Sequence, residues 1–64
     1  MTVPIVEINL LEGRPPEQIR ELIRRVHEAV EGALDAPASS IRILVREIPP
    51  AHWAAGGVTK DESG

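Results

Sequence analysis

The chain has 64 residues, enough for one domain, and a domain of this size buries only about 60% of the surface that its unfolded chain exposes. It contains no cysteine, so disulfides and thiolate metal sites are excluded, and no spacing typical of a metal site joins the only two histidines, His27 and His52. A net charge of -3 with both signs mixed along the chain, and a single aromatic residue, Trp53, argue against a nucleic-acid or membrane partner.

Residues 3–11 have the pattern of a half-buried strand. Apolar and polar side chains alternate in the order Val6, Glu7, Ile8, Asn9 and Leu10. A period of two places one kind of side chain on each face of a sheet. Pro4 fits at the start of such a strand, where its missing N–H matters least.

A helix is predicted from Pro15-Pro16-Glu17, because proline is tolerated in a first helical turn and Glu17 complements the helix dipole there. Apolar residues then recur with i, i+3 and i+4 spacing, which predicts an amphipathic helix. These residues are Ile19, Leu22, Ile23, Val26, Ala29, Val30, Ala33 and Leu34. Asp35-Ala36-Pro37 ends the helix.

A second strand is predicted over 41–48, followed by Pro49-Pro50. Ile41, Ile43 and Val45 belong to one face, and the intervening residues to the other. Strand, helix and strand joined by short links predict an α+β fold with a parallel β-α-β unit. Residues 51–58 have the composition of a loop or a short hairpin, and residues 59–64 that of a flexible polar tail.

One helix covers only one face of two strands, so the other face and the sheet edges stay open. A small domain with no disulfide or metal site is usually stabilised by association of subunits. We therefore expect a homo-oligomer. No apolar run is long enough to span a bilayer, and no signal peptide is recognisable, so we expect a cytoplasmic protein without a membrane partner.

Several short pieces, in this order and spacing, resemble the 4-oxalocrotonate tautomerase family over residues 4 to 57. They are Pro4-Ile5, Leu11-Glu12-Gly13-Arg14, Glu17-Gln18, Leu34-Asp35-Ala36-Pro37, Ser40-Ile41-Arg42, Glu47, and Trp53 with Gly56-Gly57. The resemblance implies a β-α-β subunit with a short C-terminal hairpin. It also implies that subunits assemble through dimers, usually three dimers in a hexamer.

The resemblance further implies an isomerase that converts enol or dienol 2-hydroxy acids into conjugated 2-oxo acids without a metal or organic cofactor. The family's base is the amine of an N-terminal proline, which corresponds to Pro4. Arg14 corresponds to a substrate-carboxylate ligand. Arg42 corresponds to a catalytic and substrate-binding arginine, usually supplied by a neighbouring subunit. Trp53 stands where an aromatic side chain walls the pocket.

Residues 1–3 extend the chain before this proline, and their presence makes the Pro4 nitrogen an amide that cannot act as a base. One interpretation is that Val3 represents the true start, so that methionine removal exposes Pro4. A second is an inactive oligomeric pseudoenzyme or small-carboxylate binder. A third, hydration or dehalogenation of an unsaturated acid, is less favoured because Ala54 and Ala55 supply no carboxylate beside Trp53.

Simpler roles exist for the same residues. Arg14 and Arg42 are also suited to surface ion pairs, and Trp53 to anchoring an interface between subunits.

Overall fold

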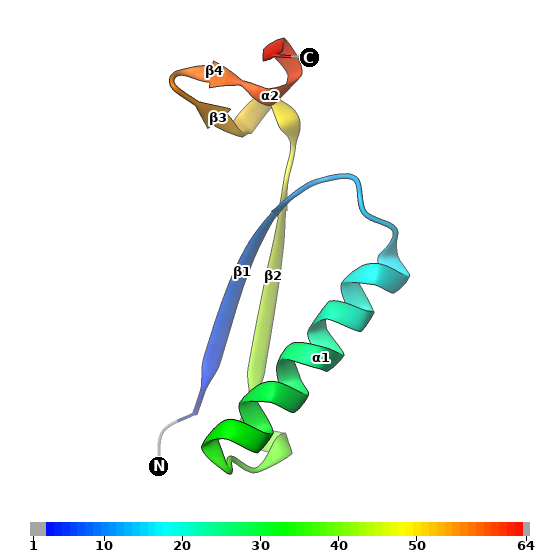
Figure 1. Cartoon of the computed structure of the whole chain (residues 1–64), viewed down its shortest axis with the longest axis vertical. Coiled ribbons are helices and arrows are strands. Elements are labelled where there is room, and N and C mark those ends of the chain that lie inside the picture. Colours follow the sequence, from blue (N-terminus) through cyan, green and yellow to red (C-terminus); the bar gives the residue numbers. More distant parts are fainter. Residues whose placement is uncertain (1–2, 64) are drawn as a thin grey trace.

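The computed structural model describes residues 3–63 and has an elongated β-α-β unit with a small C-terminal arm (Figure 1). Its main elements are strand β1 (Ile5–Leu11), helix α1 (Pro16–Leu34) and strand β2 (Arg42–Ile48). The arm contains β3 (Ala54–Ala55), β4 (Val58–Thr59) and the short helix α2 (Lys60–Ser63). The predicted α+β class, with its parallel β-α-β unit and C-terminal hairpin, is confirmed.

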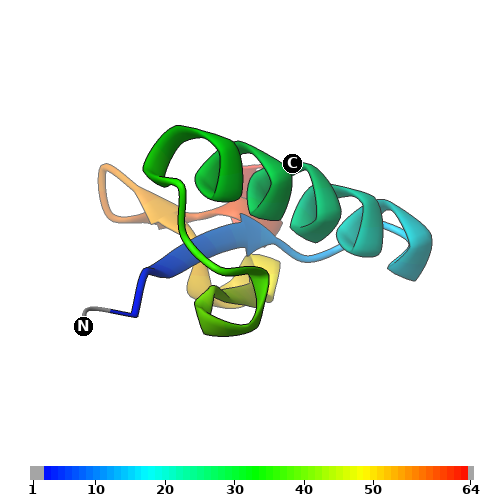
Figure 2. The ribbon, with the colours of Figure 1, turned by 90° about the horizontal axis from the view of Figure 1, so that it is seen from below.

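The two long strands pair in parallel over their whole length, from Ile5 opposite Arg42 to Leu11 opposite Ile48. Exposure alternates along both strands as the period of two predicts, except near their ends, where Leu10 and Leu11 are both half-buried and Arg46 and Glu47 are both exposed. The apolar side chains of the less exposed face pack against α1, which lies along one side of the sheet only (Figure 2). The opposite face, defined here as the open face, carries Ile5, Glu7, Asn9, Arg42, Leu44 and Arg46.

The observed elements begin and end close to the predicted limits, and short-range geometry explains the differences. β1 begins at Ile5, two residues later than predicted. β2 begins at Arg42, because the N–H of Ile41 is used in a preceding 3-10 turn, where it donates to the carbonyl of Ala38 at 3.3 Å. α1 ends before Asp35, whose φ of 52° is left-handed. Aspartate tolerates that conformation better than most residues.

The C-terminal arm folds back on itself and extends beyond the sheet (Figure 1). Gly56 and Gly57 have φ values of 60° and 80°, the positive pair that a type I′ hairpin turn requires. Two neighbouring glycines are therefore sufficient to form the turn between β3 and β4. The sequence predicts a flexible polar tail from Thr59 onward, and this prediction was wrong for the described residues. Thr59 belongs to β4, and residues 60–63 form α2.

A single subunit has almost no core. Among residues 3–62, Ile41 is the only buried residue, with 7% of its surface exposed. The radius of gyration is 15.0 Å, whereas a compact chain of this length would have about 11 Å. The accessible surface is 4878 Å², against about 4000 Å² for a compact protein of this mass. The exposed surface includes Ile5 and Leu44 of the open face at 60% and 46%.

This shortage of buried surface predicts that stability depends on association. Leu44→Asp places a charge in the middle of the open face, where an isolated subunit would tolerate it within about 0.5 kcal/mol. We expect it instead to lower the melting temperature by several degrees and to shift the sedimentation profile toward single chains. Gln18→Glu, which adds the same charge at an exposed position in the first turn of α1, is the control. A melting temperature that is independent of protein concentration and unaffected by Leu44→Asp would contradict this expectation.

Candidate active site

Pro4 lies immediately before β1 and is half-buried. Its carbonyl accepts a hydrogen bond from the backbone N–H of Arg42 at 3.0 Å. This bond joins the beginnings of the two strands, so parallel pairing brings Pro4 and Arg42 together although 38 positions separate them in the chain. The Pro4 nitrogen is bonded to the carbonyl carbon of Val3, which lies outside β1 and is 50% exposed.

The Arg42 side chain is fixed by main-chain carbonyl groups. Its Nη1 donates to the carbonyl of Ser39 at 2.7 Å and to that of Ile41 at 3.3 Å. Both hydrogen bonds use the same nitrogen, so Nη2 and Nε remain available for a carboxylate or a 2-oxo oxygen. A guanidinium suits this role because its planar donors match the geometry of a carboxylate.

Arg14 lies in the loop between β1 and α1, at the other end of the sheet. It follows Gly13, whose φ of 132° is one that side chains rarely allow and that turns the chain away from β1. Arg14 is exposed, and within residues 3–63 it forms no ion pair. It lines an open groove of about 440 Å³ beside the first turns of α1, together with Leu10, Gln18, Ile19, Glu21, Leu22 and Arg25.

Trp53 follows the second 3-10 turn (Pro50–His52) and begins the C-terminal arm. Its backbone is anchored on both sides, because its N–H donates to the carbonyl of Pro50 at 3.3 Å and its own carbonyl accepts from the N–H of Lys60 at 2.7 Å. Trp53 remains 37% exposed and lines a small depression together with Ala55, Val58 and Lys60. A large aromatic surface left open in this way is available to a substrate or to another subunit.

The four predicted site residues are divided between the two ends of the sheet. Pro4 and Arg42 lie where the parallel strands begin, whereas Arg14 and Trp53 each follow the end of a strand and line different hollows. The seven residues of β1 separate the two ends, which corresponds to about 20 Å at the usual rise of a strand. A compact site that uses residues from both ends requires a second copy of the chain.

The charges near Arg14 give its groove a positive balance. Glu21 accepts hydrogen bonds from Arg24 and, at 2.5 Å, from Arg25. The bond from Arg25 and the two nearby guanidinium charges hold the pKa of Glu21 below its usual value of 4.5. Glu21 is thus engaged by residues of its own helix. Arg14 consequently stays open to an external anion.

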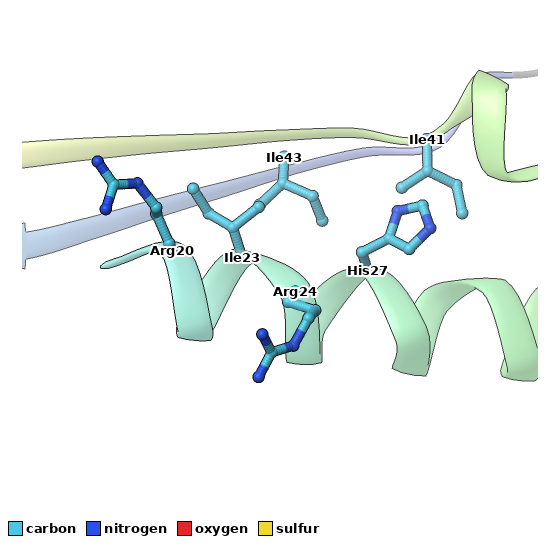
Figure 3. A pocket seen from close by; sticks show the side chains of 6 residues that line it. All are labelled: Arg20, Ile23, Arg24, His27, Ile41 and Ile43. Carbon is cyan, nitrogen blue, oxygen red and sulfur yellow. The ribbon is translucent and has the colours of Figure 1, made fainter. Parts of the chain in front are cut away.

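A second groove, of about 410 Å³, lies between α1 and β2 on the opposite side of the helix (Figure 3). Its floor is formed by Ile23, Ile41 and Ile43, and the ring of His27 points toward Ile41. His27 faces Glu31 with 3.6 Å between Nε2 and the carboxylate oxygen. These contacts give His27 a packing role, and within the described part of the chain no cluster of three metal-ligating side chains is found.

Sequence reasoning missed the contribution of the turn before β2. The sequence predicted no role for Ser39 and included Ser40 only in the Ser40-Ile41-Arg42 resemblance, yet the carbonyl of Ser39 holds the Arg42 guanidinium. The hydroxyl of Ser40 closes the turn by donating to the carbonyl of Pro37 at 2.7 Å. The available signal was the spacing of a proline and a serine three residues later, which favours a local side-chain-to-backbone hydrogen bond.

Residues 4–62 match a family of proteins described as "Tautomerase enzyme". A 2-hydroxymuconate tautomerase of Stutzerimonas stutzeri is 47% identical over 55 residues, which cover 86% of this chain and 87% of the relative.

Two solved structures are also similar. A 4-oxalocrotonate tautomerase isozyme from Methylibium petroleiphilum has a TM-score of 0.87 and 36% identity, with 95% of this chain and 98% of the other covered. A heterohexameric 4-oxalocrotonate tautomerase from Chloroflexus aurantiacus has a TM-score of 0.84 and 39% identity, with 92% of this chain and 95% of the other covered.

Within residues 3–63, no helix combines the length and the apolar character that a membrane span requires.

The ion pairs of Glu21 predict a pH dependence of stability. Because folding lowers the pKa of Glu21, its contribution is present above pH 4.5 and is lost as the pH falls through the lower value of the folded state. Glu21→Gln should reduce the melting temperature at neutral pH and remove part of its decline in acid. Glu28→Gln, at an exposed position of the same helix, should behave like the unchanged chain. Parallel melting curves for all three proteins from neutral pH to pH 3 would contradict this role.

Proposed function

The chain belongs to the tautomerase family, and we propose that it converts dienol 2-hydroxy acids into conjugated 2-oxo acids with the Pro4 amine as the base. The observation that carries the residue assignment is the backbone hydrogen bond that places Pro4 and Arg42 together at the beginnings of two parallel strands. We therefore assign to each Pro4 the Arg42 of its own chain, whereas the family resemblance implies the Arg42 of a neighbouring subunit. Family membership supports the reaction type. The name of the Stutzerimonas stutzeri relative supports a 2-hydroxymuconate-like substrate.

The proposed reaction is a proton transfer with no net change in oxidation state. The Pro4 nitrogen takes the proton of the 2-hydroxyl group, and the electron pair of the O–H bond forms the 2-oxo group. The double bonds shift along the dienol, and the distal carbon takes the proton back from the proline ammonium. Because one group accepts and returns the same proton, the reaction requires neither a metal nor an organic cofactor.

Arg42 and Arg14 act as fixed positive charges in this proposal. Arg42 binds the 2-oxo oxygen and the adjacent carboxylate, and stabilises the charge that develops as the hydroxyl loses its proton. Arg14 binds the carboxylate at the far end of the substrate. Trp53 excludes water and, with the two guanidinium groups, disfavours the protonated form of a free Pro4 amine.

The proposed site combines residues from different copies of the chain. Pro4 and Arg14 lie at opposite ends of one sheet. In this proposal two copies lie antiparallel, so that Pro4 of one copy is next to Arg14 of the other. We propose a hexamer built as three dimers. Three observations favour this assembly: the open face of the sheet, the small core of one subunit, and the heterohexamer formed by the relative from Chloroflexus aurantiacus. The resulting partners are further copies of the chain and a small carboxylate substrate.

Catalysis in this form requires that the Pro4 nitrogen be free of residue 3. Loss of residues 1–3 would leave the hydrogen bonds of the sheet intact, because β1 begins at Ile5 and the hydrogen bond from Arg42 uses the carbonyl of Pro4. With Val3 attached, the same residues form a binding site for small dicarboxylates without the base. That binder is the second candidate function, favoured by the amide bond between Val3 and Pro4.

The first test compares the full chain with a shortened chain that begins at Pro4, after intact mass has established both N-termini. We expect turnover of 2-hydroxymuconate by the shortened chain to exceed that of the full chain by about 10²-fold or more, the usual contribution of a positioned base. In the shortened chain, Pro4→Ala should remove most of this gain. Equal turnover by all three proteins would exclude Pro4 from the mechanism.

The second test concerns Arg14. Arg14→Ala in the shortened chain should raise KM by about 10- to 100-fold, the range expected for the loss of hydrogen bonds to a charged group. The effect on kcat should be smaller, because Arg14 is distant from the reacting hydroxyl. Arg20→Ala, which removes an exposed guanidinium from α1, should leave KM unchanged. An equal increase of KM in both variants would show that Arg14 contributes only to the overall surface charge and does not bind the substrate.

A further inference from the structure

We propose that Ser40 is a positioning residue for Arg42, acting through the 3-10 turn that precedes β2. The inference rests on the proposed function, in which Arg42 binds the substrate. The turn (Ala38–Ser40) connects the end of α1 with the first residue of β2. It supplies the carbonyl group that fixes the Arg42 guanidinium, so its shape determines where the guanidinium lies.

Ser40 closes this turn with two hydrogen bonds to one acceptor. Its backbone N–H donates to the carbonyl of Pro37 at 2.9 Å, and its hydroxyl donates to the same oxygen at 2.7 Å. A carbonyl oxygen accepts two such bonds through its two lone pairs. The next bond of the turn, from Ile41 to Ala38, is 3.3 Å long and therefore weak. Without the hydroxyl, one good hydrogen bond would hold the turn.

The carbonyl of Ser39 points to Nη1 of Arg42 at 2.7 Å. Ser39 lies between the two residues that the Ser40 hydroxyl ties together, so a looser turn moves this carbonyl directly. Arg42 is exposed, and an exposed arginine samples many rotamers unless its guanidinium is held. The hydroxyl of Ser40 therefore restricts the rotamers of Arg42 without touching the substrate.

The first measurement is independent of substrate. The 15N heteronuclear NOE of Arg42 Nε in the full chain reports whether the side chain is ordered. We expect a high value in the unchanged chain and a clear decrease in Ser40→Ala. Ser40→Thr keeps the hydroxyl and should restore the value. Circular dichroism and sedimentation of each variant establish that the fold and assembly are retained.

The second measurement uses muconate, a six-carbon conjugated dicarboxylate, as a non-reacting probe of the full chain by calorimetry. Arg42→Ala should raise the dissociation constant by about 10- to 100-fold, and Ser40→Ala by about three- to tenfold. In an Arg42→Ala background, the substitution Ser40→Ala should have no further effect. Such a cycle separates positioning of Arg42 from a general loss of stability.

The outcomes distinguish this inference from the proposed function. An unchanged Arg42 NOE in Ser40→Ala overturns the inference, and so does an equal loss of muconate affinity in both backgrounds. If Arg42→Ala itself leaves muconate binding unaffected, the function proposed for Arg42 fails, and the inference fails with it. If Arg42→Ala weakens binding while Ser40→Ala does not, only the inference is overturned.

Discussion

The parallel pairing of β1 with β2 is the constraint on which the rest of the structure depends. Its register places Ile5 opposite Arg42, and this alone brings the beginning of the chain next to an arginine from its second half. The same register assigns one face of each strand to α1 and leaves the other face open. Because side chains alternate with a period of two, a shift by one residue would exchange the faces and turn Arg42 toward the helix.

The small size of the subunit connects stability with function. The chain cannot bury enough apolar surface by itself, and its sheet has one covered face, two edges and a protruding arm. The same architecture divides the candidate site residues between the two ends of the sheet. Association in our account therefore has two consequences: it stabilises the subunits, and it brings the base of one copy close to the carboxylate-binding arginine of another.

Much of this fold could be predicted because it is encoded locally. The periodicities of the strands and of α1, the prolines at the element boundaries and the Gly56-Gly57 turn are properties of neighbouring residues. Three features depend on contacts that local patterns do not encode. They are the register that places Ile5 opposite Arg42, the hydrogen bond from Arg42 to the carbonyl of Ser39, and the continuation of residues 60–63 as α2. Backbone carbonyl groups carry no signature in a sequence, so the second of these was not predictable from residue types.

Subunit complementation tests the central claim, a site shared between copies, most directly. Two chains that begin at residue 4, one with Pro4→Ala and one with Arg14→Ala, are each impaired in turnover of 2-hydroxymuconate at substrate concentrations well below KM. After they are unfolded and refolded together, our account predicts recovery to about a quarter of the unchanged activity, because random association unites an intact Pro4 with an intact Arg14 in that share of the sites. Activity no greater than the average of the two separate proteins would contradict a site built from more than one copy.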